Sequence, residues 1–115
     1  MGEGGGVAGT ITRGDVRLFR FPHPGKQRLV VVLTADRAIG YLARVTVAPI
    51  TSTIRGVPSE VLINEADGMK SPCAVNLHSV VTVPKDWLGR RVAALSNERL
   101  HEICAALGFA LGCSS

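Results

Sequence analysis

The chain has 115 residues and a formal net charge of +4; 46% of its residues are hydrophobic, 19% are charged and 4% are aromatic. These proportions indicate one globular domain with an aliphatic core, and they exclude a chain that is disordered throughout. The charge is uneven, because residues 13–55 hold eight Lys or Arg and two acids, whereas the rest of the chain holds five and seven. This favours an anionic partner such as RNA or an acidic protein segment, although a solvated charged face gives the same signature.

The chain has three cysteines, Cys73, Cys104 and Cys113, and their odd number and wide spacing argue against a disulfide framework or a zinc knuckle. We therefore expect a reducing compartment, the cytoplasm. We expect no membrane segment, because no apolar run approaches the ~20 residues that span a bilayer and the amino terminus does not resemble a signal peptide. The acids lack the spacing of metal ligands and no glycine motif cradles a phosphate, so we expect neither a metal nor a cofactor.

Residues 1–12 include five glycines and are expected to form a disordered leader, followed by a single domain over residues 13–115. Asp15–Phe21 alternates polar and apolar residues, the pattern of a half-buried strand. Leu29–Leu33 is continuously apolar, which favours a central strand that is covered on both faces. The residues after Leu33 could form a short irregular or helical piece.

A series of short strands and one helix is expected over the rest of the chain. Ser96 is a suitable helix N-cap, and Glu98 suits the first turn of the helix that follows. The apolar stripe of that helix consists of Leu100, Ile103, Leu107 and Leu111, and the strands are expected at Arg44–Ile50, Ser59–Ile63, Cys73–Leu77, Val80–Val83 and Arg91–Leu95. The fold class is therefore α+β, mainly β: a small barrel of antiparallel strands closed by a C-terminal helix.

Two strand ends form the candidate site. Arg28 opens the apolar run Leu29–Leu33, and Thr51 follows the predicted strand Arg44–Ile50. A guanidinium binds phosphate oxygens through paired hydrogen bonds and stays charged, so Arg28 and Thr51 together make a plausible phosphate site. Arg28 could equally be a solvated residue at a strand edge.

Polar residues near these strand ends are candidates for RNA binding. A histidine can act as an acid or base near neutral pH, so His23 could protonate a leaving group or be an ordinary loop residue. Trp87 is expected to be a core or dimer residue, and Cys73 to be an inert buried thiol. The candidate RNA-binding residues are His23, Lys26, Ser52, Thr53, Arg55, Asn76 and His78.

Four segments together resemble the MazF/PemK family of toxin endoribonucleases. They are Arg13–Val16, Arg28 with Val30–Leu33, Val47–Ser52, and Ser71–Leu77 followed by Val80–Lys85. The resemblance implies a CcdB/MazF-like, SH3-like barrel that works as a homodimer and belongs to a type II toxin-antitoxin system. It implies cleavage of single-stranded mRNA at short specific sequences without a metal, and a cognate antitoxin whose acidic flexible segment covers the active site.

The family's catalytic pair falls on Arg28 and Thr51. The resemblance implies attack by the RNA 2′-hydroxyl, leaving a 2′,3′-cyclic phosphate and a 5′-hydroxyl; Arg28 would stabilise charge on the phosphorane, and Thr51 would hold a phosphate oxygen. The alternative is a non-catalytic toxin of the same fold that binds and poisons DNA gyrase, typically through an aromatic helix tip that Phe109–Ser115 lacks. A third alternative is an inactive relative that only binds antitoxin or RNA.

Overall fold

A computed structural model describes residues 10–20 and 27–113 of the chain. The strands are β1 (Asp15–Arg20), β2 (Gln27–Val32), β3 (Arg44–Thr51), β4 (Glu60–Ile63), β5 (Cys73–Asn76), β6 (Val81–Pro84) and β7 (Leu88–Ala94). The α-helices are α1 (Asp36–Ile39) and α2 (Asn97–Leu111), and the 3-10 helices are η1 (Glu65–Asp67), η2 (Leu77–Ser79) and η3 (Lys85–Trp87). The prediction of a mainly β, α+β fold that ends in a helix is confirmed.

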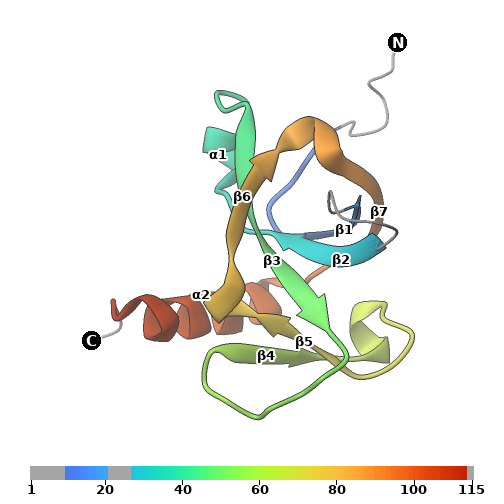
Figure 1. Cartoon of the computed structure of the whole chain (residues 1–115), viewed down its shortest axis with the longest axis vertical. Coiled ribbons are helices and arrows are strands. Elements are labelled where there is room, and N and C mark those ends of the chain that lie inside the picture. Colours follow the sequence, from blue (N-terminus) through green and yellow to red (C-terminus); the bar gives the residue numbers. More distant parts are fainter. Residues whose placement is uncertain (1–9, 21–26, 114–115) are drawn as a thin grey trace.

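All strands belong to one antiparallel sheet, ordered β4-β5-β3-β2-β1-β7, with β6 also paired to β3. Strand β3 organises the sheet, since it pairs with β6 over Arg44–Val47, with β2 over Val47–Pro49, and with β5 at Ile50 and Thr51. Figure 1 shows the result: β3 crosses the middle of the molecule, with β1, β2 and β7 on one side of it and β4 and β5 near its end. The C-terminal end of β3 is therefore where the two parts of the sheet meet.

Strand β2 has core on both of its faces. Val30, Val31 and Val32 are all fully buried. Val31 packs in the apolar cluster that contains Ile103 of α2, whereas Val30 and Val32 pack in a second cluster around Phe19. Alternate residues of a strand face opposite sides, so these three valines reach both clusters. The prediction that this continuously apolar strand is central and covered on both faces is confirmed.

Helix α2 covers one side of the sheet. The Ser96 hydroxyl caps it by accepting a hydrogen bond from the Arg99 amide at 3.2 Å. Ile103 is fully buried, and α2 packs against η2 and β4. The predicted stripe ends early, because Leu111 is 62% exposed where the helix runs past the strands, as Figure 1 shows.

The structure extends two predicted boundaries. Residues 10–12, which the sequence assigns to the leader, contact the domain: Ile11 is buried, and the Thr10 carbonyl accepts a hydrogen bond from Arg17 at 3.0 Å. The rest of the expected leader lies outside the described residues. Strand β7 begins three residues earlier than predicted, because Leu88 pairs with Phe19 of β1. Residue Trp87, expected in the core or a dimer seam, is half exposed, and its ring centre lies 6.1 Å from that of Phe19.

No helix in the described part of the chain is long and apolar enough to cross a membrane.

Candidate active site

The ends of β2 and β3 bring Arg28 and Thr51 into one groove. In the β2–β3 ladder Val30 lies opposite Pro49. Arg28 lies two residues before Val30 on β2, and Thr51 lies two residues after Pro49 at the end of β3. Both residues line a groove of about 500 Å³. The guanidinium and the hydroxyl that the sequence nominates are therefore neighbours around one concave surface.

The groove has an aliphatic floor and a polar, cationic rim. Its lining residues come from β1, β2, β3, β5, β7 and the segment Gly68–Ser71 that follows η1. None of the described residues that line it is acidic or aromatic. The floor consists of Leu18, Leu29, Ile50, Met69, Cys73 and Val92, and the rim of Gln27, Arg28, Thr51, Ser52, Lys70, Ser71 and Arg90. Such a surface suits an anionic ligand that also carries apolar faces.

The Thr51 hydroxyl is oriented by its own loop. Its Oγ1 accepts a hydrogen bond from the Thr53 amide at 3.1 Å. A hydroxyl that already accepts from an amide still has its own proton to donate, so Thr51 can donate to an oxygen of a bound ligand.

The guanidinium of Arg28 is exposed, and we find no hydrogen bond or ion pair from it to any other residue that the structure describes. Its five N–H donors are thus available to a ligand.

The segment Gly68–Ser71 forms one wall of the groove and is fixed at its start by a capping box. The Asn64 side chain accepts a hydrogen bond from the Ala66 amide at 2.8 Å, and the Asp67 carboxylate accepts one from the Asn64 amide at 2.9 Å. Asp67 also binds the Arg99 guanidinium of α2 at 3.0 Å. The wall is therefore tied to the C-terminal helix.

The next two residues fix the rest of this wall. Gly68 has φ +93°, and a Cβ there would lie 3.0 Å from the Cβ of Ala93. Only glycine satisfies both demands without strain. Met69 then enters the core and is 6% exposed. Lys70 and Ser71 therefore directly follow a residue that is anchored in the core.

Two pKa shifts lie at this wall. Burial tends to raise the pKa of Asp67, but the hydrogen bonds from Arg99 and from the Asn64 amide outweigh it and hold that pKa below its ordinary value. Burial raises the pKa of the Cys73 thiol, and the charge of Asp67 raises it further. Cys73 is thus a neutral thiol at neutral pH, in agreement with the expectation of an inert residue.

Of the predicted RNA-binding residues that the structure describes, only Ser52 lines the groove. His23 and Lys26 lie outside the described residues. Thr53 serves Thr51 through its amide, and Asn76 accepts a hydrogen bond from the His78 amide at 3.1 Å. These two polar groups have local structural roles.

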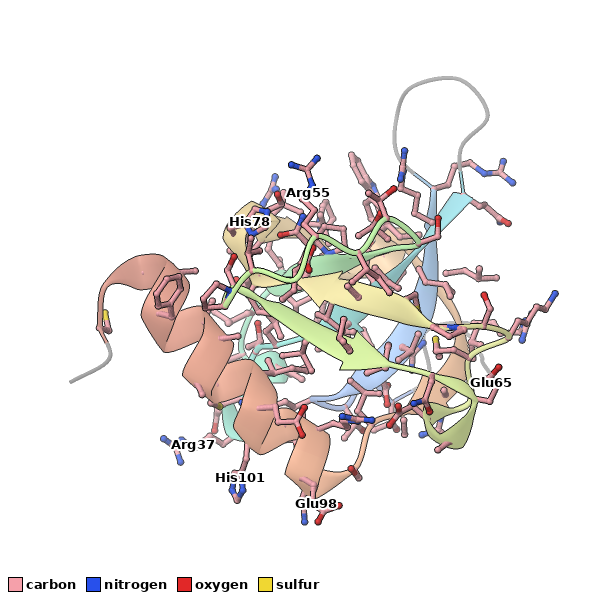
Figure 2. All side chains as sticks on the ribbon, turned by 90° about the horizontal axis from the view of Figure 1, so that it is seen from below. Arg37, Arg55, Glu65, His78, Glu98 and His101 are labelled. Atoms are coloured by element: carbon pink, nitrogen blue, oxygen red, sulfur yellow. The ribbon has the colours of Figure 1, made fainter. Side chains whose placement is uncertain are left out.

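Arg55 and His78 are placed elsewhere. The Arg55 amide is held by the Glu60 carboxylate at 3.0 Å, and His78 Nδ1 lies 2.5 Å from the Ser59 hydroxyl. Figure 2 shows Arg55 and His78 close together on one side of the molecule, separated from Glu65 of η1. They form a polar surface apart from the groove.

Sequence reasoning missed Lys70 and Arg90, both of which are exposed and line the groove. The pair Arg90-Arg91 carries a partial signal, because adjacent strand residues face opposite sides. Arg91 lies 3.7 Å from the buried carboxylate of Asp15, whereas Arg90 faces the groove. The pairing of β7 with β1 determines which of these two arginines faces the groove.

No group of three or more His, Cys, Asp or Glu side chains suited to a metal ion occurs within residues 10–20 and 27–113.

Comparison with known proteins identifies the family. Residues 12–111 match the model of the PemK-like, MazF-like toxins of type II toxin-antitoxin systems. The chain is 43% identical over 103 residues to the probable endoribonuclease MazF5 of Mycobacterium tuberculosis, covering 89% of this chain and 94% of that protein. It is 37% identical over 91 residues to the probable endoribonuclease MazF2 of the same species, covering 78% and 89%.

Solved structures agree with this match. The Mycobacterium tuberculosis toxin MazF-mt6 superposes with a TM-score of 0.80 at 30% identity, covering 88% of this chain and 99% of that chain. An endoribonuclease from a mycobacterial species, solved with its cognate antitoxin, has a TM-score of 0.82 at 23% identity, covering 91% and 98%. The second likeness shows the fold alone. From the family match and these relatives it follows that the chain belongs to the PemK-like, MazF-like toxins of type II toxin-antitoxin systems.

Proposed function

We propose that this MazF-type endoribonuclease toxin cuts single-stranded mRNA at short specific sequences, without a metal, by attack of the 2′-hydroxyl on the adjacent phosphorus. Arg28 and Thr51 are the proposed catalytic residues. One observation carries the proposal: a guanidinium without a partner among the described residues and an oriented hydroxyl line the same groove, and none of the described lining residues is acidic. A phosphodiester fits that charge pattern.

The two side chains would act on the charge that develops during cleavage. The O2′–P bond forms and the P–O5′ bond breaks, while O2′ loses a proton and O5′ gains one. The phosphorane between these events carries extra negative charge on its non-bridging oxygens. The fork of Arg28 can bind two of those oxygens, and the Thr51 proton can bind one. The products are a 2′,3′-cyclic phosphate and a 5′-hydroxyl.

The partners proposed from the same features are a cognate antitoxin and a second copy of this chain, with the cytoplasm as the site of action. The mycobacterial endoribonuclease solved with its cognate antitoxin supports the first of these. An acidic flexible segment would suit the cationic rim of the groove and would compete with RNA for it. Adding the antitoxin to a complex of this protein with labelled RNA should therefore displace the RNA.

The proposal is tested by incubating the purified protein with a mixed RNA pool in EDTA and sequencing the new 5′ ends. Wild-type protein should give ends that need phosphorylation before ligation, clustered at one short sequence. Arg28→Ala and Thr51→Ala should each lower the cleavage rate roughly 10²–10³-fold, the usual cost of losing one transition-state donor. Circular dichroism and thermal melting should show that both variants stay folded.

Arg37→Ala is a matched control, because Arg37 is exposed on α1 and is not among the residues that line the groove. Figure 2 shows Arg37 and Glu65 of η1 at opposite sides of the view. Full cleavage by Arg28→Ala would refute the catalytic assignment. Intact RNA together with inhibition of DNA gyrase would favour the non-catalytic toxin, and intact RNA with antitoxin binding alone would favour an inactive relative.

A further inference from the structure

Three cationic side chains from three different elements surround the groove. Arg28 comes from β2, Lys70 from the segment after η1, and Arg90 from β7. Within the described segments none of the three has an ion pair, whereas Arg17 pairs with Asp15 and Arg99 with Asp67. Like charges that share one groove without a carboxylate repel one another when the groove is empty, so a ligand with several negative charges relieves the repulsion.

The positions of Lys70 and Arg90 are fixed by the backbone. Lys70 directly follows Met69, which is anchored in the core. Arg90 follows Gly89, where an added Cβ would lie 3.3 Å from the Leu18 carbonyl oxygen of β1. Glycine permits this close approach of β7 to β1, and the next residue, Arg90, lines the groove beside the aliphatic floor. The backbone thus places both cations on the rim of the groove, where one ligand can contact both.

We propose that Lys70 and Arg90 bind the backbone phosphates on either side of the scissile phosphate, so that the groove holds at least three consecutive phosphates of a single strand. This inference rests on the proposed function, in which Arg28 contacts the central phosphate. The hydroxyl and amide groups on the rim, Ser52, Ser71 and Gln27, can then reach base edges or sugar oxygens. Lys70 and Arg90 act in binding rather than in bond cleavage.

The floor decides how the strand is held. The described residues that line the groove offer the bases aliphatic contacts and no aromatic stacking platform. Among these residues, the three cations are therefore the strongest contacts available to the strand. Binding that depends on phosphate contacts weakens steeply with salt, because each contact releases counterions.

The experiment measures binding of a fluorescein-labelled 12-mer DNA pool of random sequence by anisotropy, between 50 and 300 mM NaCl. DNA lacks the attacking 2′-hydroxyl, so it reports binding whether or not the protein cuts RNA. Lys70→Gln and Arg90→Gln should each weaken binding roughly three- to tenfold and reduce the slope of log Kd against log salt by about 0.7, the contribution of one single-strand phosphate. Lys70→Arg and Arg90→Lys should preserve the slope, and Arg37→Ala should match wild type.

The outcomes separate this inference from the proposed function. Altered salt slopes without RNA cleavage would support phosphate binding by Lys70 and Arg90 and refute the nuclease. RNA cleavage with unchanged slopes in both glutamine variants would support the nuclease and refute phosphate binding by Lys70 and Arg90. If wild-type protein binds a polyglutamate peptide but no DNA, the groove is a peptide site and the inference fails. For RNA substrates the glutamine variants should raise KM while leaving kcat close to wild type, and a fall in kcat alone would contradict a binding role.

Discussion

Arginines on neighbouring strands of this protein fall into two groups. Those of the first group pair with a carboxylate, and those of the second have no carboxylate partner among the described residues. Arg17 is 3% exposed, and its Nε binds the buried carboxylate of Asp15 at 3.1 Å. Arg28 and Arg90 are exposed, and no carboxylate contacts them within the described residues. A charge that is removed from water needs an opposite charge beside it, whereas an exposed charge is stabilised by hydration and can bind a ligand. The first group therefore serves the fold and the second is available for function.

The contrast extends to single neighbours in the sequence. Arg90 and Arg91 are adjacent on β7, yet Arg91 lies 3.7 Å from Asp15 while Arg90 lines the groove. Their different surroundings follow from the alternation of side chains along a strand. The comparison predicts that changes in the paired group lower stability, whereas changes in the unpaired group lower activity and leave stability unaltered.

The largest effect is expected from Asp15→Asn. This change removes the negative charge but keeps the shape, leaving Arg17 buried without a counter-charge. The free energy of unfolding should fall by about 3–5 kcal/mol, as measured by urea denaturation. Arg91→Ala should cost less than about 1 kcal/mol, because the Arg91 side chain is 57% exposed and water already screens its charge. A stable Asp15→Asn protein would show that this ion pair does not support the fold.

A second, smaller effect is expected from Arg28→Lys. The charge is kept but the planar fork is lost, so a phosphate oxygen loses one charged hydrogen bond. RNA cleavage should slow roughly 10- to 100-fold, while the free energy of unfolding should stay within about 0.5 kcal/mol of wild type. The measurements are kcat/KM on a cleaved oligonucleotide and the urea midpoint. Full activity in Arg28→Lys would mean that charge alone suffices at this position.

A third effect, smaller than that of Asp15→Asn, is expected from Asp67→Asn. Asp67 links the two groups, because it pairs with Arg99 and also holds the wall that carries Lys70. The pKa of Asp67 in the folded protein lies below the ordinary value of 3.8. Its ionised form therefore stabilises the fold above that ordinary value, and the contribution is lost as the pH falls through the folded pKa. At pH 7 the substitution should cost about 1–2 kcal/mol of unfolding free energy.

The pH dependence provides the check on this last prediction. Urea denaturation of wild type and Asp67→Asn should differ at pH 7, and the difference should shrink below pH 3.8. Glu102→Gln is the control, since Glu102 binds the same guanidinium at 3.1 Å but its side chain is 51% exposed. A stability difference between wild type and Asp67→Asn that stays constant with pH would contradict the role of the Asp67 charge.

Part of the site could be predicted because its signals are local. Arg28 stands where a polar segment changes to an apolar run, and Thr51 stands at the next such boundary. Both boundaries are strand ends in the structure. Arg55 follows Thr51 closely in sequence but does not line the groove, because the Glu60 carboxylate holds the amides of Arg55 and Gly56 in a separate turn. Proximity along the chain therefore does not predict which residues share a site where a loop changes direction.

Lys70 and Arg90 could not be assigned to the site from the sequence. The ladder between β1 and β7 contains register shifts between Val16 and Arg17 and between Arg17 and Phe19. Each shift alters which residues of β7 face the groove, so counting alternate residues does not identify Arg90. The place of Lys70 depends on the approach of Gly68 to Ala93, a contact between segments far apart in the chain.

The order of polar and apolar residues by itself determined the strands, the twice-covered β2, the helix start at Ser96 and the two strand-end residues, because each of these depends on neighbours within a few positions. Only the tertiary structure decided which cations are buried with a carboxylate and which line the groove. That choice depends on strand register and on the path of β3 between three partner strands, and no local pattern encodes either.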